Sequence, residues 1–134
     1  MLGYENVNVN PKGRLTGDCS TRALVGVMGI GYEEAIKRQC YWATKTCYGL
    51  TDKQVMEKVL AEEGWVKMKQ PRKADGSKYT VGELDKLISL EVRRRGVLVT
   101  VANHHTCIVG NVVQDTWDCR YKSVGNYYIN TRSR

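Results

Sequence analysis

The hydrophobic pattern of the chain changes at Val97, and this change constrains the fold more than any other feature of the sequence. The segment VLVTVA is apolar and rich in β-branched residues, which is typical of a buried strand, and strand-like segments follow it. The dipeptide Gly110–Asn111 is a tight-turn signal between two of these segments. The pattern therefore predicts a C-terminal antiparallel sheet with strands over residues 97–102, 104–109, 112–117 and 124–130.

The segment before Val97 has a helical period instead. Apolar residues recur at helical spacing in ALVGVM, so a helix is predicted to begin near Asp18 or Cys19 and to end at Gly29 and Gly31. We expect the carboxylate of Asp18 to cap this helix by accepting a hydrogen bond from a free backbone N–H of the first turn. Later helices are predicted over 32–43, over 51–63 with Thr51 and Gln54 as a capping box, and from the capping box of Thr80 and Glu83 to Arg93–Gly96.

Helices followed by an antiparallel sheet indicate an α+β fold. The length of 134 residues fits one domain over 1–134, and a domain of this size folds without a disulfide or a metal. The segment ENVNVNPKGRLTG is predicted to be an extended arm and a loop, because it holds one proline and two glycines. Trp65–Met68 is predicted to be a short strand.

The cysteine pattern bears on the compartment and on metal binding. The chain has five cysteines at irregular spacing, which does not resemble a secreted disulfide framework. No C-x-x-C or H-x-x-x-H pair is present, so neither a metal site nor a cofactor is predicted. The sequence has no N-terminal signal pattern and no apolar run of membrane-spanning length, so we expect a cytoplasmic protein that does not enter a membrane.

The net charge of +7 favours an acidic partner. The basic residues are spread along the chain, and the densest runs, Lys67–Lys73 and Arg93–Arg95, lack the interleaved aromatic residues that stack on bases. A solvated basic surface is therefore the favoured interpretation. A basic nucleic-acid-binding domain stays an alternative.

Cys19 stands at the front edge of its predicted helix and not inside the apolar run. A thiol reacts as the thiolate, and a helix N-terminus stabilises that anion. Activation also needs a base, and the base needs an orienting partner. The two histidines, His104 and His105, lie at the start of a predicted strand, and Asp115 lies on the next strand. Each residue alone is more often structural than functional, so the prediction of a catalytic site depends on their combination.

The predicted hairpin brings Asp115 within reach of His104. A turn centred on the Gly–Asn dipeptide places His104 opposite residue 117, which makes Asp115 its diagonal neighbour. Because successive strand residues face opposite ways, His104 lies on the more polar face and is the better base, whereas His105 is predicted to be structural. A turn near Asn103 would restrict this parity argument to the second strand.

The order of these motifs resembles the papain-like cysteine peptidase superfamily. The matching features are the cysteine that opens a helix in TGDCS, the motif N-H-x5-G over Asn103–Gly110, and D-x-W over Asp115–Trp117. In that superfamily an Asn or Asp orients the strand histidine, and the adjacent tryptophan shields their hydrogen bond from water. The spacing to the glycine selects His104 independently of parity. The resemblance leaves Tyr32–Arg95 unmatched, and it extends to small bacterial and phage proteins of this fold.

The resemblance implies a papain-like fold, with N-terminal helices packed on the antiparallel sheet, and a cysteine-dependent hydrolase of the peptidase, amidase or isopeptidase type. His104 would take the proton of Cys19, and Asp115 would fix the tautomer of the ring. The thiolate would attack a protein or peptide substrate to form a thioester, which water resolves. An amine acceptor in place of water would make the protein a transferase.

One position departs from the pattern of the superfamily. Gly13 stands where a glutamine usually helps to form the oxyanion hole, so Asn10 or Asn8 is expected to supply that donor, with the backbone N–H of Cys19 as the second. A missing side-chain donor costs about 3 kcal/mol of transition-state stabilisation. The alternative is therefore a catalytically weak or inactive papain-like scaffold that acts as a protein-binding adaptor or inhibitor, for example in a phage–host conflict.

Overall fold

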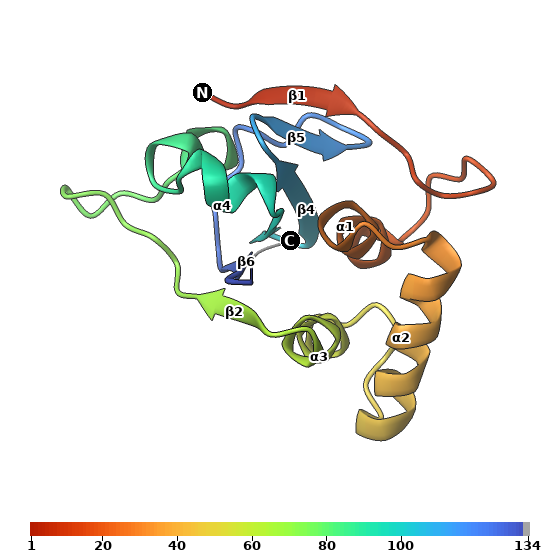
Figure 1. The fold of residues 1–134 in the computed structure, drawn as a ribbon. Helices are drawn as coiled ribbons and strands as arrows, with labels where there is room; N and C mark the ends of the chain where they lie inside the picture. Colours follow the sequence, from red (N-terminus) through yellow and green to blue (C-terminus); the bar gives the residue numbers. More distant parts are fainter. Residues whose placement is uncertain (133–134) are drawn as a thin grey trace.

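The computed structural model describes residues 1–132 and has an α+β fold in which helices cover both faces of one six-stranded sheet (Figure 1). Four α-helices and a short 3₁₀ helix, η1, accompany the strands in this part of the chain. In chain order the elements are β1 (Gly3–Asn6), α1 (Cys19–Met28), α2 (Tyr32–Thr46), α3 (Lys53–Glu62), β2 (Trp65–Met68), η1 (Val81–Lys86), α4 (Leu90–Arg94), β3 (Val97–Val101), β4 (His104–Val109), β5 (Val112–Asp115) and β6 (Tyr127–Asn130).

The sheet is mixed, with the strand order β1-β5-β4-β3-β6-β2. The four C-terminal strands predicted from the sequence form its centre and pair antiparallel. The predicted strand at Trp65–Met68 is confirmed and forms one edge as β2. The other edge is β1, which pairs parallel to β5, so the first residues are not only an arm and loop as predicted. The backbone of Gly3–Asn6 forms its hydrogen bonds with β5, which would otherwise be an unpaired edge of the sheet.

The hairpin around Gly110–Asn111 has the predicted register. Ile108 pairs with Val113 and Val109 with Val112, and the same register continued to the start of β4 sets His104 opposite residue 117. The turn before β4 falls at Ala102–Asn103, where Asn103 has a φ of 56°. This turn interrupts the alternation of side chains between the two faces of the sheet. The comparison of His104 and His105 by alternation therefore holds within β4 and does not extend to β3.

Two apolar layers lie on the two faces of the sheet. Helices α1 and α3 cover one face, where Leu24 and Val59 pack with Leu98, and η1 with α4 covers the other, where Leu84 packs with Val99 (Figure 1). Of the helices, α1 packs most extensively on β4. Gly26 allows this close approach, because a Cβ atom at that position would collide with the Sγ atom of Cys107 on β4. The N-terminus of α1 is thereby held beside the start of β4.

Several helix ends differ from the sequence prediction. The C-terminal end of α1 at Gly29 is confirmed, with the left-handed conformation expected of a C-cap glycine. The capping box of Thr80 and Glu83 is confirmed as well, but it opens the 3₁₀ helix η1, and a separate helix, α4, follows. The capping box predicted at Thr51 is wrong, since α3 begins at Lys53.

The helix length bears on membrane insertion. Within residues 1–132 no helix is both long enough and apolar enough to cross a bilayer.

Candidate active site

Three of the predicted site residues meet where α1 begins, β4 begins and β5 ends. Cys19 is the first residue of α1, His104 is the first residue of β4, and Asp115 is the last residue of β5. His104 and Asp115 are buried, and Cys19 is half-buried. The close packing of α1 on β4 and the register of the hairpin are therefore the two features of the fold that assemble this site.

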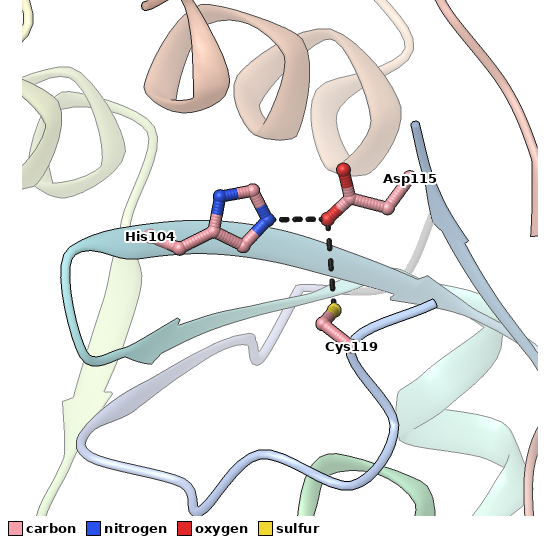
Figure 2. Close-up of side chains that lie close together, drawn as sticks. All are labelled: His104, Asp115 and Cys119. Carbon is pink, nitrogen blue, oxygen red and sulfur yellow. Dashed lines mark hydrogen bonds and ion pairs between the residues drawn. The ribbon is translucent and has the colours of Figure 1, made fainter. Parts of the chain in front are cut away.

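His104 and Asp115 are joined directly (Figure 2). The Nε2 atom of His104 lies 2.6 Å from Oδ2 of Asp115. An ionised carboxylate can only accept hydrogen bonds, so Nε2 carries the proton of this bond. The other ring nitrogen, Nδ1, points away from Asp115 in Figure 2. The side chain of His104 also makes a hydrogen bond with the thiol of Cys19. Asp115 thus selects the tautomer that a base acting on Cys19 requires.

The thiol of Cys19 has a lowered pKa. Burial raises this pKa, but a hydrogen bond with the side chain of His104, a hydrogen bond from the backbone N–H of His105 and the charges of His104 and Arg22 outweigh burial. The pKa of His104 moves the opposite way: burial lowers it, and hydrogen bonds with Asp115, Cys119 and Cys19 raise it to about 11. Both shifts favour transfer of the proton from sulfur to ring.

Asp115 stays ionised beside this pair. Burial raises its pKa, but the hydrogen bond with His104 and further polar contacts lower it to about 2. Its second oxygen, Oδ1, accepts hydrogen bonds from the backbone N–H of Thr116 at 2.7 Å and from Nη1 of Arg22 at 3.1 Å. Both oxygens are therefore occupied, and the carboxylate is fixed in orientation.

Trp117 covers the histidine. Its ring centroid lies 4.9 Å from that of His104, with the two planes tilted by 50°. Trp117 is half-buried and packs on the apolar layer under η1. The indole ring thus lies beside the imidazole ring, and its shielding of the bond between His104 and Asp115 stays a prediction.

His105 has a different environment. Its side chain makes no hydrogen bond to Asp115, and its buried Nδ1 atom has no partner within residues 1–132. Burial, with the charges of His104 and Lys53, lowers its pKa to about 4, so the ring is neutral at physiological pH. The side chain is not a fully satisfied structural histidine, but its backbone N–H donates to the sulfur of Cys19.

Asn10 lies next to the site without pointing a free amide at it. Its Nδ2 atom donates to Oδ2 of Asp18 at 3.1 Å and lies 3.5 Å from the hydroxyl of Tyr32. Asn8 is turned to its own loop, where its Nδ2 donates to the carbonyl of Arg14. The structure thus brings Asn10 to the residue that precedes Cys19, whereas its role as an oxyanion donor stays a prediction.

Asp18 does not cap α1, and this prediction is wrong. The side chain makes no cap hydrogen bond and instead accepts from Arg22 at 2.8 Å and from the hydroxyl of Tyr32 at 2.8 Å, besides Asn10. These charged and hydroxyl donors are stronger partners than a backbone amide. The carboxylate of Asp18 therefore does not occupy the N–H groups of the first turn, which are the groups a helix offers to an anion.

Sequence reasoning missed two residues of the site, Arg22 and Cys119. Arg22 contacts Asp18, four residues before it, which i,i+4 spacing could have indicated, but its contact with Asp115 depends on the tertiary fold. The thiol of the fully buried Cys119 lies 3.6 Å from Oδ2 of Asp115, so this oxygen accepts from both His104 and Cys119 (Figure 2). No local signal distinguishes Cys119 from a core cysteine.

His104, Asp115 and Cys119 are also the residues that could hold a metal ion, since their donor atoms lie within 4.8 Å of one another. Two ligands of one tetrahedral zinc lie about 3.3 Å apart, because each bond is about 2.0–2.1 Å long. The separation of 2.6 Å between Nε2 and Oδ2 is shorter and matches a shared proton. The arrangement of these donors therefore fits a hydrogen-bonded acid–base pair better than a metal site.

No family model, curated protein or solved structure matches this chain. The functional interpretation consequently depends on the site geometry and on the resemblance of its motifs.

Proposed function

We propose that the protein is a cysteine-dependent hydrolase of the peptidase, amidase or isopeptidase type with Cys19, His104 and Asp115 as its catalytic triad. The observation that supports this best is the 2.6 Å bond between Nε2 of His104 and Asp115, which leaves Nδ1 to the thiol. A papain-like fold would place a nucleophile at a helix N-terminus and its base on a strand in the same way. The five cysteines are all unpaired, as expected for a protein that works in a reducing cytoplasm.

The reaction follows from the charge state of the pair. The Cys19 thiolate attacks the carbonyl carbon of an amide, and the oxyanion that forms accepts a hydrogen bond from the backbone N–H of Cys19. Asn10 would become the second donor only when its amide turns away from Asp18. The His104 imidazolium then gives its proton to the leaving amine, so that the C–N bond breaks and a thioester remains on Cys19. His104 next takes a proton from water while the water oxygen bonds to the thioester carbon. The C–S bond then breaks, which releases the carboxylic acid and restores the thiolate–imidazolium pair.

Two exposed cysteines in the chain provide an internal control for the first test. Cys40 and Cys47 are exposed and Cys19 is only half-buried, so accessibility alone would make Cys19 the slower thiol. At neutral pH we expect iodoacetamide to modify Cys19 first, as mapped by peptide mass spectrometry. The variant H104A should abolish this preference, and equal labelling of all accessible cysteines would contradict the proposal.

Turnover is tested with a panel of fluorogenic peptides, amides and isopeptides. We expect hydrolysis by the wild-type protein and by C40A, and none by C19A or H104A. Selective labelling of Cys19 without turnover of any substrate would instead favour the inactive scaffold that binds a partner protein.

A further inference from the structure

Arg22 connects the two halves of the site. It lies inside α1, three residues after Cys19, and its side chain is only 13% exposed. Its Nε atom donates to Oδ1 of Asp18 at 2.8 Å, and its Nη1 atom donates to Oδ1 of Asp115 and to Oγ1 of Thr116, each at 3.1 Å. One guanidinium thus bridges the residue before the nucleophile and the carboxylate that orients the base.

These contacts close a ring of interactions around the reacting atoms. Asp115 binds His104, His104 interacts with Cys19, Cys19 follows Asp18 in the chain, and Asp18 binds Arg22, which returns to Asp115. Tyr32 and Asn10 hold the second oxygen of Asp18 from outside the ring. Among the members of this ring, only Arg22 contacts both carboxylates.

We propose that Arg22 is the positioning residue of the site, which fixes the first turn of α1 relative to Asp115 and His104 and balances the charge of the two carboxylates beside the thiolate. This inference depends on the proposed function, because it assigns a role within the same triad.

The chemistry of the side chain explains why an arginine is needed. The planar guanidinium presents several N–H donors in a fixed fork, so it reaches Asp18, Asp115 and Thr116 at the same time, whereas a lysine ammonium acts as a point charge on a flexible stem. Without a cation here, Asp18 would lose its ion pair and Asp115 would be opposed by His104 alone, so that the added negative charge near Cys19 would disfavour the thiolate.

The chain offers a matched control for Arg22. Arg38 on α2 also binds a carboxylate four residues before it, Glu34 at 3.1 Å, and one distant in sequence, Glu63 at 2.8 Å. Its side chain is 25% exposed, and it lies outside the ring of interactions around Cys19. Loss of an arginine with two ion pairs can therefore be separated from loss of the arginine that serves the site.

The test compares R22Q, R22K and R38Q by the pH dependence of the Cys19 alkylation rate, by turnover and by thermal unfolding. The acid limb of the alkylation profile is the pH range in which the rate falls because the thiolate of Cys19 is protonated. For R22Q we expect this limb to move to higher pH by about one unit, which is a tenfold loss of thiolate at the acid end of the profile. R22K should restore part of this shift, because it keeps the charge and loses the fork. R38Q should have the wild-type limb and the wild-type rate of turnover.

An unchanged acid limb in R22Q, or a loss confined to thermal stability as in R38Q, would overturn the inference. Should R22Q fail to fold, the comparison becomes R22K against R38K, and the inference requires a severalfold slower alkylation of Cys19 in R22K alone. Equal rates in R22K and the wild type would then reject it. If H104A leaves the alkylation rate of Cys19 unchanged, the triad itself is rejected. If H104A slows the alkylation of Cys19 but R22Q does not, only the role of Arg22 is rejected.

Discussion

Replacing Asp115 by asparagine should be far more damaging than the resemblance to papain-like enzymes suggests. Asparagine orients the histidine in many members of that superfamily, so D115N looks conservative. In this protein, however, both carboxylate oxygens accept hydrogen bonds, Oδ2 from His104 and Cys119 and Oδ1 from Arg22 and the N–H of Thr116. An asparagine amide has one acceptor oxygen. Its NH₂ group would therefore face either the donors His104 and Cys119 or the donors Arg22 and the Thr116 N–H.

The size of the effect follows from the bond that is lost. A hydrogen bond to a charged group contributes about 1.5–3 kcal/mol, and one pKa unit corresponds to about 1.4 kcal/mol. Asp115 favours the imidazolium of His104, so its loss lowers the pKa of His104 and raises the pKa of the coupled Cys19 thiol. The acid limb of Cys19 alkylation in D115N should therefore move up by about one to two pH units.

The assay is the second-order rate of iodoacetamide modification at Cys19, followed by mass spectrometry from acid to alkaline pH. D118N is the matched control, because Asp118 is a nearby carboxylate that pairs with Arg120 at 2.7 Å and does not touch His104. It should retain the wild-type profile. A folded D115N protein whose acid limb coincides with that of the wild type would refute the assignment of Asp115 as the orienting group.

Two further predictions concern packing around the site. G26A should lower the free energy of unfolding by about 1–3 kcal/mol, because its methyl group collides with Cys107, and adding C107A should recover part of this loss in chemical denaturation. W117A should expose the bond between His104 and Asp115 to water and move the acid limb of Cys19 alkylation to higher pH, whereas W117F should keep the wild-type limb. If the acid limbs of W117A and W117F coincide, Trp117 does not shield this bond.

The fold was predictable where the signal is local. The strands of the C-terminal sheet, the turn at Gly110–Asn111 and the helix that begins at Cys19 follow from period and turn chemistry, which act between neighbours in sequence. The parallel pairing of β1 with β5 was not predictable, because it joins residues more than a hundred positions apart and uses a segment without apolar alternation. The start of α1 at Cys19 is as predicted, but the cap expected from Asp18 is not formed, because Arg22 and Tyr32 occupy its carboxylate.

The candidate site divides along the same line. Cys19, His104 and Asp115 could be selected from motif order and hairpin register, and the structure brings all three together. Arg22 and Cys119 could not, because what marks them is contact with Asp115 in three dimensions and not a local pattern. Asn10 was predicted to be an oxyanion donor from its place in the sequence alone, and in the structure its amide binds Asp18.

The preference for aspartate over asparagine at position 115 follows from the arginine on α1. A neutral amide could satisfy His104 alone, but it would leave Asp18 as the remaining anionic partner of the partly buried Arg22 guanidinium, and removing one partner of such a pair is costly. One carboxylate therefore serves two cations from two elements, α1 and β4, and its charge is what makes both contacts favourable. On this argument the identities of residues 22 and 115 are coupled, so the combined variant R22M/D115N should lose less Cys19 reactivity than the two single losses predict together.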